Sequence, residues 1–591
     1  FIGGLYEGTA SEKASITIND VTYTYNNGWL VDGYTVLADG LLKKDNEYKV
    51  TNAAGLVTLS GMTIKASEVV TLGADIDLNG VTFNGLKAFN SENNNTFDGK
   101  GFTVSNWTNN SGASDMGFIK SWVGTIKNVK FDNANISGYS YVAVVAGNLY
   151  GNIDNCHVAN STVTCTYWMA GAMSGQYNNG NVTNCSVKNT TVTGPAAVGA
   201  LVGNINETAG ERKIENCTVE NCTVAQNGSF GGDYDLMFGS VVGLINIDNS
   251  KVYINGCEVE NTTVKGATSA NVFGCVGGDQ TKVYINGYEF VADGVGMKDG
   301  EYYISSAAGL KWVADKVNST TPYTASIFDN TTVKLTKDID LNNEEWIPIG
   351  DDRSQRTEWH GVFDGQGFTV SNIKITKKTD IDDDNKSSYG LFGNVKGTVK
   401  NLTVENVSIS GAPKFIGALV GRLNDGLIEN CHVKNSAVEC ENWTIGGLVG
   451  QFNNGKISNC SVEGTSIKGY AAVGAIAGIA LSNGERTIEN CTVKNCSLIQ
   501  NGNFGGDYDK MFGAIVGALY SGNLIVNVNN CSVEDTNIKN KASSVICGFV
   551  SEGDKLLING NEFVADGVTV DAQGNYYISN AAGLVYMSAN A

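Results

Sequence analysis

A long internal duplication constrains the fold of this chain more than any other feature of its sequence. Seven cysteines of the first part recur in the second, at an offset of 275 for three pairs, 274 for three and 272 for one. The run Phe-Gly-Gly-Asp-Tyr-Asp at 230–235 likewise returns at 504–509. Self-similarity on this scale is typical of repeat architectures, in which each unit packs on its neighbours. The cysteine pairs are Cys156 and Cys431, Cys165 and Cys440, Cys185 and Cys460, Cys217 and Cys491, Cys222 and Cys496, Cys257 and Cys531, and Cys275 and Cys547.

Both ends of the chain read like parts of the same repeat. The run Ala-Ala-Gly-Leu at 53–56 returns at 307–310 and again at 581–584, and residues 1–8 read like the end of a copy at 547–553. We therefore expect this chain to be part of a longer tandem array of such copies. The predicted divisions are 1–50 as the tail of a preceding copy with linker strands, 51–281 as the first copy, 282–305 as linker strands, 306–557 as the second copy, and 558–591 as a linker and the start of a third copy.

Within each copy, a shorter repeat indicates strands of four to six residues. It has Ile or Val at position i, Asn at i+2, Cys or another apolar residue at i+3, and Val or Phe at i+5, as at Ile153, Val182 and Ile457. Such strands, separated by Gly, Asn and Ser turns, bury a continuous core only when stacked as coils. The predicted fold is an all-β, right-handed parallel β-helix (a solenoid) in two tandem copies with short capping helix and strand segments. The right hand is expected because β-to-β crossovers usually have it.

Other repeat folds fit this pattern less well, and the ends of a β-helix need covering. A propeller requires four strands per repeat, and a leucine-rich solenoid requires a helix or Leu-rich spacing in each repeat. Neither pattern occurs in this sequence. Open ends of a coil stack are exposed sheet edges. Leu310, Val313 and Val317 have helical spacing after Ser305 or Ser306, which predicts an N-capped helix next to a copy boundary near residue 300.

Composition and charge exclude several classes of protein. The 591 residues include 73 Gly and 4 Pro, with 42% hydrophobic and 17% charged residues, which favours a packed β-rich chain over a disordered one. The formal net charge is −20 and no continuous basic stripe occurs, so nucleic acid is not an expected partner. The sequence has no apolar stretch of 18 residues, so no membrane span is predicted in this chain.

The recurrent asparagines and cysteines are expected to be structural. Asn at i+2 tolerates left-handed backbone at a corner, and its amide can bond along the stack. Cysteines at i+3 would form a column in the core, where parallel side chains have poor geometry for disulfides, so we expect reduced, buried thiols. Metal binding is not predicted, because Cys-x-x-Cys pairs are absent. The ladder asparagines are Asn128, Asn155, Asn184, Asn216, Asn401, Asn430, Asn459, Asn490 and Asn530.

The strand motifs resemble the GLUG motif. The likeness is carried by Gly-Leu-Phe-Gly at 390–393 and Gly-Leu-Val-Gly at 447–450, and the runs at 338–341, 346–350 and 363–367 resemble the segment that opens GLUG-containing β-helices. The first copy lacks a counterpart of 346–350. Over nearly its whole length, the chain is similar to GLUG-motif parallel β-helix surface proteins of gut Bacteroidetes, which are grouped with adhesins.

This resemblance implies an extracellular protein of the cell surface. It would be anchored in the outer membrane through a part outside this chain, and its partner would be a host or microbial surface protein or glycan. GLUG repeats also accompany immunoglobulin A proteases. The zinc motif His-Glu-x-x-His does not occur here, so that activity does not transfer.

Residues suited to catalysis are scarce. His157 and His432 occupy equivalent positions, and neither has a Ser or Asp partner in its local sequence. Arg212 and Arg486 each follow Gly-Glu, where a salt bridge in a turn explains them. No catalytic residue is therefore predicted.

The repeated Phe-Gly-Gly-Asp-Tyr-Asp loop is the best candidate for ligand binding. Paired aspartates beside aromatic rings can hold calcium or a sugar, and the alternative interpretation is a glycine-rich turn with solvated carboxylates. The run at 380–385 also resembles a calcium loop, but it lacks Gly at the sixth position and Glu at the twelfth. Calcium is therefore left open, and no other cofactor is expected. The predicted ligand-binding residues are Asp233, Tyr234, Asp235, Asp507, Tyr508 and Asp509.

Two functions are compatible with these features. The array, the acidity and the missing catalytic constellation favour a non-catalytic extracellular adhesin or structural stalk, and not an enzyme. The alternative is a glycan-binding or polysaccharide-degrading β-helix. A groove with close carboxylates and exposed aromatic residues such as Trp168 or Trp443 would favour the alternative, and a smooth coil with buried tryptophans would favour the adhesin.

Overall fold

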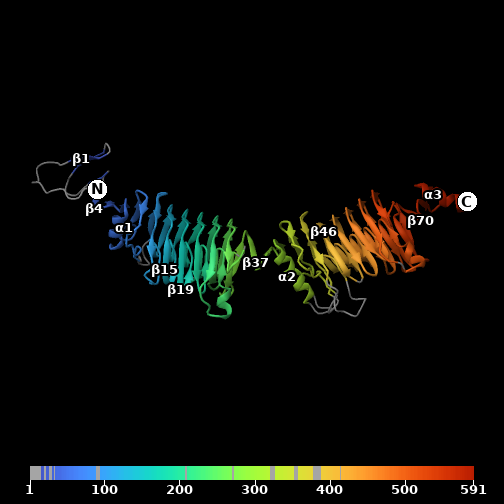
Figure 1. Ribbon diagram of the computed structural model, residues 1–591, viewed down its shortest axis with the longest axis horizontal. Coiled ribbons are helices and arrows are strands. Elements are labelled where there is room, and N and C mark those ends of the chain that lie inside the picture. The colour runs from blue at the N-terminus through green and yellow to red at the C-terminus, as the bar shows by residue number, and fades with distance from the viewer. Residues whose placement is uncertain are drawn as a thin grey trace, which may run out of the picture. The chain divides into compact units, whose positions relative to one another are not determined.

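The chain forms a β-solenoid of about 15 turns, with 52% of residues in strands and 8% in helices, which confirms the predicted fold class. The structure is a computed structural model that describes residues 34–591 except 88–93, 207–208, 269–271, 320–325, 352–356, 377–387, 413, 503 and 591. Before residue 34 it describes the backbone of three short strands, and at residues 268 and 412 the backbone alone. The chain divides into two compact units, 1–289 and 290–591 (Figure 1).

In the N-terminal unit, successive turns add strands to four parallel columns. The register keeps template positions in line, so Ile126 pairs with Ile153 and Ile153 with Val182. The first column holds β7 (Val69–Leu72), β9 (Asn95–Asp98), β13 (Gly124–Lys127), β17 (Asn152–Asp154), β21 (Asn181–Thr183), β26 (Glu211–Glu215), β31 (Lys251–Asn255) and β36 (Lys282–Ile285). The second holds β8 (Ile76–Asp77), β10 (Thr103–Ser105), β14 (Lys130–Asp132), β18 (His157–Ala159), β22 (Ser186–Lys188), β27 (Thr218–Glu220) and β32 (Glu258–Glu260).

The other two columns of this unit flank the loop singled out by the sequence. One holds β11 (Thr108–Asn109), β15 (Asn135–Val142), β19 (Thr162–Ala170), β23 (Thr191–Gly194), β28 (Thr223–Gln226), β33 (Thr263–Val264) and the antiparallel β34 (Ala267–Thr268), with β24 (Val198–Gly199) and β29 (Phe238–Gly239) beside it. The last holds β12 (Ile119–Trp122), β16 (Ala146–Tyr150), β20 (Ser174–Asn179), β25 (Val202–Asn206), β30 (Val242–Asn246) and β35 (Phe273–Val276).

The C-terminal unit is built in the same way. Its first two columns hold β40 (Thr332–Leu335), β41 (Ile339–Asp340), β42 (Val362–Asp364), β43 (Thr369–Ser371), β46 (Thr398–Glu405), β50 (Leu427–Lys434), β54 (Lys456–Ser458), β55 (Ser461–Glu463), β59 (Gly484–Glu489), β60 (Thr492–Lys494), β64 (Leu524–Asn529), β65 (Ser532–Glu534) and β69 (Lys555–Ile558). A third holds β44 (Lys374–Ile375), β47 (Ser408–Ala412), β51 (Ala437–Cys440), β56 (Ser466–Gly469), β61 (Ser497–Gln500), β66 (Asn537–Ile538) and the antiparallel β67 (Lys541–Ala542).

Two short columns complete this unit and carry the GLUG-like runs. One holds β48 (Ile416–Gly417), β52 (Trp443–Gly446), β57 (Ala471–Gly474) and β62 (Phe512–Gly513). The other holds β45 (Phe392–Val395), β49 (Val420–Leu423), β53 (Val449–Phe452), β58 (Ala477–Ala480), β63 (Val516–Leu519) and β68 (Cys547–Val550).

Short helices follow small strands where each copy begins, as the sequence predicts. Ser306 caps helix α2 (Ala307–Asn318) by accepting from Gly309 N, and Leu310, Val313 and Val317 are buried, which confirms the predicted helix. The corresponding helices are α1 (Ala53–Ser60) and α3 (Ala581–Asn590). The small strands are β1 (Ser15–Ile18), β2 (Val21–Thr24), β3 (Leu30–Val31), β4 (Tyr34–Ala38), β5 (Leu41–Lys44), β6 (Glu47–Val50), β37 (Tyr288–Ala292), β38 (Val295–Lys298), β39 (Glu301–Ile304), β70 (Asn561–Ala565), β71 (Val568–Val570) and β72 (Tyr576–Ile578).

The glycines of the GLUG-like runs are required by the close approach of neighbouring turns. A Cβ added at Gly450 would lie 2.6 Å from Gly421 O, and one added at Gly478 would lie 2.7 Å from Gly450 O. In the N-terminal unit, a Cβ at Gly203 would lie 2.5 Å from Gly175 O. Backbone atoms so close leave no room for any side chain, so the repeated glycine is a packing requirement of the stack.

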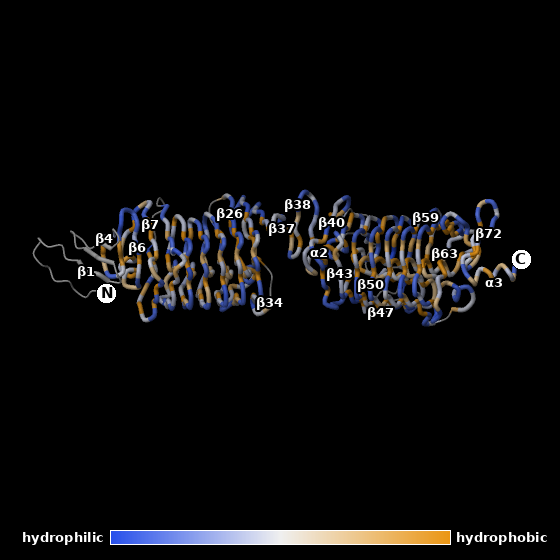
Figure 2. Tube along the Cα trace, turned by 90° about the horizontal axis from the view of Figure 1, so that it is seen from above, coloured by the Kyte–Doolittle hydropathy of each residue, from blue (hydrophilic) through white to orange (hydrophobic). Residues whose placement is uncertain are grey.

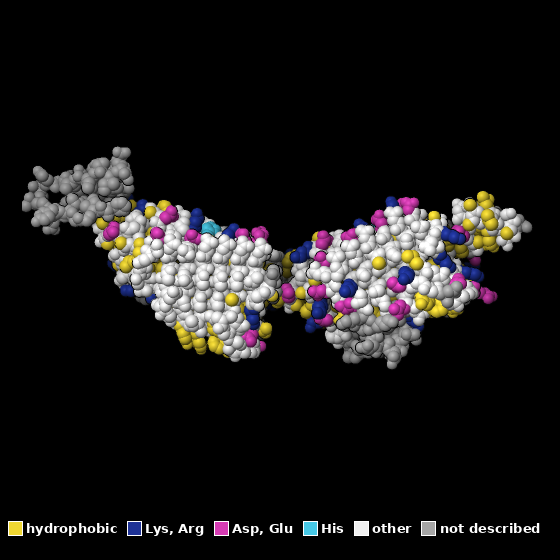
Figure 3. Space-filling view, viewed as in Figure 1, with side chains coloured by type: hydrophobic (Ala, Val, Ile, Leu, Met, Phe, Trp, Pro, Cys, Tyr) yellow, Lys and Arg dark blue, Asp and Glu magenta, His cyan; other side chains and the backbone are white. Residues whose placement is uncertain are grey.

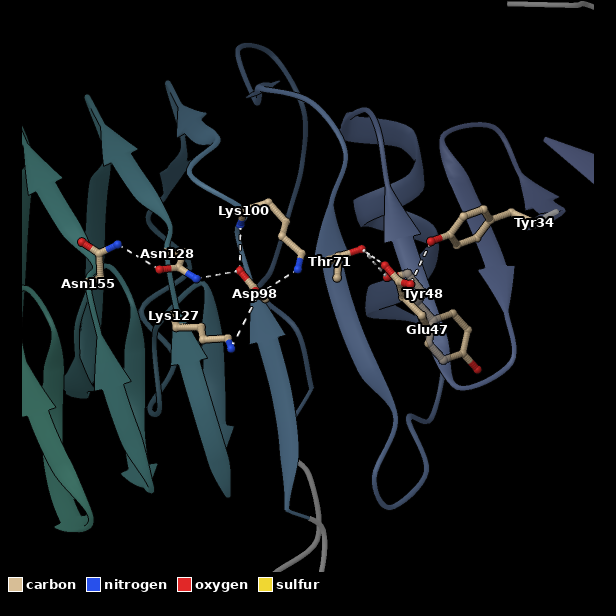
Figure 4. A network of polar contacts seen from close by, with 9 residues as sticks. All are labelled: Tyr34, Glu47, Tyr48, Thr71, Asp98, Lys100, Lys127, Asn128 and Asn155. Atoms are coloured by element: carbon tan, nitrogen blue, oxygen red, sulfur yellow. Dashed lines mark hydrogen bonds and ion pairs between the residues drawn. The ribbon is translucent and has the colours of Figure 1, made fainter. Parts of the chain in front are cut away.

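Asparagine ladders run along the stack and confirm the predicted role of this residue. Asn155 donates through Nδ2 to Asn128 Oδ1 at 2.9 Å, and Asn128 donates to Asp98 at 3.0 Å (Figure 4). Lys100 and Lys127 also pair with the Asp98 carboxylate, at 3.2 and 3.7 Å. Burial opposes ionisation of Asp98, but the bonds from Asn128 and Lys100 outweigh it and lower the pKa of this carboxyl group. All nine ladder asparagines have φ between 50° and 56°, the left-handed region that Asn tolerates.

The core is apolar and recurs from turn to turn (Figure 2). All fourteen cysteines are free thiols in the structure, and eleven of them are buried, as expected for small apolar core residues. Arg212 and Arg486, for which turn salt bridges were expected, are buried. Both side chains are 2% exposed, and their guanidinium groups donate to main-chain carbonyls, Arg212 to Asn178 O at 2.5 Å and Arg486 to Leu481 O at 2.6 Å.

Candidate functional site

The Phe-Gly-Gly-Asp-Tyr-Asp loop of the N-terminal unit leaves the solenoid between β28 and β29 and forms a short 3-10 helix, η1 (Gly232–Leu236). Gly231 and Gly232 have φ of 75° and 62° with open space around them, so glycine is needed here for its backbone freedom. The C-terminal unit repeats this turn in η2 (Gly506–Lys510). Both units therefore form the same turn, and its glycines direct the following aromatic and acidic side chains outward.

The predicted aspartates have different roles and do not converge on one ligand. Asp235 accepts hydrogen bonds from Gln226 Nε2 at 2.6 Å and from Ser229 Oγ at 2.9 Å, and these bonds lower the pKa of the Asp235 carboxyl group. Lys265 Nζ donates to the Asp235 main-chain oxygen at 2.9 Å. Asp233 is exposed. The Asp235 side chain therefore holds the loop together.

In the second copy, too, one aspartate is bonded within the loop and the other is exposed. Gln500 Nε2 donates to Asp509 Oδ1 at 2.9 Å, and Lys539 Nζ donates to the Asp509 main-chain oxygen at 2.8 Å. Asp507 forms an exposed ion pair with Lys510 at 2.9 Å. Within the described part of the chain, no three His, Cys, Asp or Glu side chains are grouped so as to hold a metal ion. The calcium-like run at 380–385 lies outside the described residues.

The aromatic side chains of the first loop join others from the solenoid wall in an exposed cluster. Trp168 contacts Tyr234 and Phe230 with ring centroids 5.4 and 5.9 Å apart, and Tyr167 contacts Phe230 at 5.7 Å. Tyr139 stacks on Tyr167 at 4.7 Å with an interplanar angle of 2°. We call Tyr139, Tyr167, Trp168, Phe230 and Tyr234 the first aromatic cluster. Four of its side chains are 41–47% exposed, which is unusual for rings of this size.

Strand geometry places this cluster. Tyr139 lies on β15 and Tyr167 and Trp168 on β19, and the register between these strands shifts after Gly138, where Ser140 pairs with Trp168. A bulge of this kind re-aims outward side chains. Hydrophobic side chains gather at one edge of the N-terminal unit (Figure 3), where the green loop projects beside β19 (Figure 1).

The second copy keeps the loop but changes its aromatic neighbours. Phe504 contacts Tyr470 at 5.4 Å and Tyr508 at 5.8 Å, and Tyr508 contacts Trp443 at 5.9 Å. We call these four residues the second aromatic cluster. Its Tyr470 comes from a different strand end than the stacked tyrosines of the first cluster, so the two copies present different surfaces around one conserved loop design.

Each equivalent histidine has a serine partner, which the local sequence did not reveal. His157 Nδ1 lies 2.8 Å from Ser186 Oγ, and His432 Nδ1 lies 2.8 Å from Ser461 Oγ. The partners come from the next turn, since His157 pairs in register with Ser186. Burial lowers the pKa of both histidines, and nearby lysines lower it further. A Ser–His pair is one element of nucleophilic catalysis, but both pairs lie in the register of a sheet face, and His432 and Ser461 line neither of the two cavities described in the C-terminal unit.

A cleft of about 490 Å³ on the C-terminal unit is the second candidate feature. Its size is in the range of small-molecule sites, about 300–1,000 Å³. Asn394, Arg422 and Gln451 enter it from three neighbouring strands, β45, β49 and β53, at positions that pair in register. The complete lining is Glu358, Asn394, Lys414, Phe415, Arg422, Asn424, Trp443, Thr444, Gln451, Asn453 and Leu481.

Side chains on one side of the cleft form a chain of hydrogen bonds with a single direction. Gln451 Nε2 donates to Asn453 Oδ1 at 2.6 Å, and Asn453 Nδ2 donates to Asn424 Oδ1 at 2.8 Å. Asn424 Nδ2 then donates to Glu358 Oε1 at 2.7 Å. Gln451 is 9% exposed, and its Oε1 accepts no hydrogen bond from the described residues. A buried acceptor left without a donor costs about 1–3 kcal/mol.

The first copy has a different arrangement at the equivalent positions. Gln176 donates to Asn178 at 2.8 Å, and Asn178 donates to Asn148 at 2.5 Å. Asn148 stands where the second copy has Arg422, because Asn148 pairs with Gln176 as Arg422 pairs with Gln451. In sequence, Tyr150 follows Asn148 and Leu149 as Asn424 follows Arg422 and Leu423, and the register of β16 on β20 shifts at Tyr150. The chain that ends on a carboxylate therefore belongs to the second copy.

Sequence reasoning found the loop and missed most of its surroundings. Trp168 and Trp443 were singled out as possible exposed aromatic residues, and both are half-buried at the edges of the features described here. Tyr139 and Tyr167 were missed, although their spacing of one turn could have shown that they stack. Glu358, Asn424 and Asn453 were missed because they lie outside the strand template. The cleft has one carboxylate in its lining, so it matches neither the groove nor the smooth coil expected for the two functions.

Comparisons with known proteins support the GLUG resemblance over one turn. The GLUG motif model matches residues 441–467. That segment holds β52, β53, β54 and β55, and with them Trp443, Gln451 and Asn453 of the cleft. The chain is thus a β-solenoid with a GLUG motif.

One curated relative matches part of the chain. A protein of Evansella cellulosilytica named "Putative Gly-rich membrane protein" is 30% identical over 141 residues, which cover 23% of this chain. The match spans 15% of the length of that relative. Across the described residues of this chain, no helix has the length and apolar character needed to cross a membrane.

Similarities to solved structures are distant. A Bacteroides ovatus structure titled a "putative immunoglobulin A1 protease" gives a TM-score of 0.26 at 16% identity, covering 43% of this chain and 81% of that one. The tailspike protein 3 of bacteriophage CBA120 gives a TM-score of 0.15 at 10% identity, covering 89% of this chain and 65% of that one.

Proposed function

We propose that this chain is a non-catalytic module of an extracellular surface protein, which adheres to a partner through its exposed aromatic clusters. One observation carries the proposal: four rings of the first aromatic cluster are 41–47% exposed and contact one another. Soluble proteins rarely expose a contiguous apolar patch without an interaction to serve. Tyr and Trp are also enriched among the residues that dominate binding energy.

The solenoid suits the role of a spacer that carries such clusters. Each turn adds about 4.8 Å, so the number of stacked turns sets the length of each unit. The GLUG turn and the membrane protein named among the relatives agree with a place at the cell surface. We infer that the partner is a host or microbial surface protein or glycan and that the anchor, at the outer membrane, lies in another part of the protein.

Replacing Phe230 and Tyr234 together with serine is expected to weaken partner binding by about 30-fold for each ring, and by about 1,000-fold if the two effects add, because each anchor ring of an interface is worth roughly 2 kcal/mol. The measurement is binding of the full chain to a glycan array and to a panel of immobilised surface proteins. Tyr576→Ser is the matched control, since Tyr576 is 55% exposed but lies outside both clusters.

Binding is expected to persist in a calcium chelator and in the double variant Asp233→Ala with Asp507→Ala, because the exposed aspartates are not needed to hold the loop. Equal binding by wild type and the Phe230 and Tyr234 variant would contradict the proposal. Loss of binding in the chelator would instead indicate that the loop holds calcium and that partner binding needs it.

A further inference from the structure

The cleft of the C-terminal unit contains an acceptor that lacks a donor. Gln451, Asn453 and Asn424 donate in sequence toward the Glu358 carboxylate. An amide that donates to a strong acceptor becomes a better acceptor at its own oxygen. The series of hydrogen bonds that ends on Glu358 therefore strengthens Gln451 Oε1 as an acceptor. Among the described residues, that oxygen receives no hydrogen bond. A donor that enters the cleft would complete the chain.

The rest of the lining restricts which donor fits. Lys414 and Arg422 bring cationic donors, Glu358 brings an anionic acceptor, and Phe415 and Trp443 bring aromatic rings. The Arg422 guanidinium lies 3.8 Å from the centroid of the Phe415 ring and stacks on it. A hydrocarbon ligand would leave the Gln451 oxygen without a donor, and a simple anion would meet the Glu358 carboxylate. A ligand that fits this lining offers a hydroxyl donor, a hydroxyl oxygen toward the cationic side chains and an apolar face together.

A sugar ring meets all three requirements. Each hydroxyl is both donor and acceptor, and the ring carbons present an apolar face to an aromatic side chain. We propose that this cleft binds a sugar residue of a glycan, with one hydroxyl donating to Gln451 Oε1 and the ring resting against Trp443. This site goes beyond the adhesive function proposed above, because it uses a polar cleft in the second copy that shares only Trp443 with the second aromatic cluster and nothing with the first.

Two substitutions test the cleft without removing a core contact of the solenoid. Asn424→Tyr introduces the residue that the first copy carries at the corresponding place in its sequence, Tyr150, and both fills the cleft and interrupts the chain. Gln451→Met keeps the length of the side chain and removes both the Oε1 acceptor and the Nε2 donor to Asn453. Gln176→Met is the matched control in the first copy, whose chain does not end on a carboxylate.

The experiment is saturation-transfer NMR and calorimetry on the full chain, with a panel of methyl hexosides, methyl hexuronides and methyl N-acetylhexosaminides. At least one glycoside is expected to bind wild type and the Gln176→Met variant equally. Its affinity is expected to fall about tenfold or more in Asn424→Tyr and Gln451→Met, because the bound hydroxyl loses its acceptor or its space. The urea midpoint of unfolding should change little in Gln451→Met, because removing the unpaired buried oxygen offsets the loss of the hydrogen bond to Asn453.

Two results would overturn the proposal: no glycoside binds, or binding is the same in wild type and in both cleft variants. The Phe230 and Tyr234 double variant separates this proposal from the adhesive function. It is expected to keep glycoside binding while losing the surface partner. Loss of the partner in that variant, with no glycoside bound by any form, would refute the sugar site alone.

Discussion

Replacing Gly203 with alanine is expected to destabilise the N-terminal unit by about 1–3 kcal/mol or more, the range for overpacking a dense interior. The added Cβ would lie 2.5 Å from Gly175 O and 2.7 Å from Ala170 N, both main-chain atoms of the turn below. A flexible side chain could move away, but these atoms are fixed by the strand register. In an open strand the same change would stabilise slightly, because alanine restricts the unfolded chain more than glycine does.

Gly228→Ala is the control for this expectation within the same unit. Its Cβ would lie 3.4 Å from Pro195 Cβ, an ordinary contact. Urea unfolding followed by circular dichroism gives the midpoint of each variant, and only Gly203→Ala should shift it downward. Equal midpoints for the two variants would show that the turns can move apart, and that the GLUG glycines are not required by packing.

Alkaline pH is expected to unfold the solenoid cooperatively. Burial raises the pKa of Cys165 to about 11 and that of Cys440 to about 12, from an ordinary 9.0. Above pH 9 the unfolded chain releases these protons while the folded chain keeps them, so each such thiol lowers the free energy of unfolding by about 1.4 kcal/mol per pH unit. The stability is present in full below pH 9 and is lost as pH rises toward the folded pKa.

The effect is large because the pKa is raised for the thiols of twelve cysteines, six in each unit. The measurement is the urea midpoint at intervals between pH 7 and pH 11. In Cys165→Ala and in Cys440→Ala, the free energy of unfolding of the unit concerned should fall less steeply with pH. The difference in slope should be about 1.4 kcal/mol per pH unit, the value for one proton. A midpoint that is constant from pH 8 to pH 11 would contradict burial of the thiols. The twelve are Cys165, Cys185, Cys217, Cys222, Cys257, Cys275, Cys440, Cys460, Cys491, Cys496, Cys531 and Cys547.

The fold could be predicted from sequence because its contacts repeat at the period of the sequence. Asn128 and Asn155 bond to each other because they occupy the same template position one turn apart. The cap of α2 was equally local, since Ser306 and the helix it caps are adjacent. A solenoid converts sequence spacing into spatial neighbourhood, so a correct repeat alignment predicts the columns.

The candidate sites were harder to predict because they are made where the repeat breaks. The loop at 230–235 was visible as a repeated motif, but Tyr139 joins its cluster by stacking on Tyr167, beside a shift in register that the template does not show. Glu358 reaches Asn424 across 66 residues, from a segment before the first GLUG-like run. Arg212 and Arg486 were assigned to turns because burial of a charged side chain cannot be read from its neighbours in sequence. The His157 and Ser186 pair was missed for the same reason.

Adhesion without catalysis is tested most directly by one measurement on one sample. The full chain is incubated with the glycan or surface protein that it binds most tightly, and the bound fraction and the mass of the recovered ligand are determined together. We predict stable binding and a ligand of unchanged mass after prolonged incubation. Shortened or modified ligand, with the change abolished in His157→Ala or His432→Ala, would contradict a non-catalytic surface module and assign the solenoid to an enzyme.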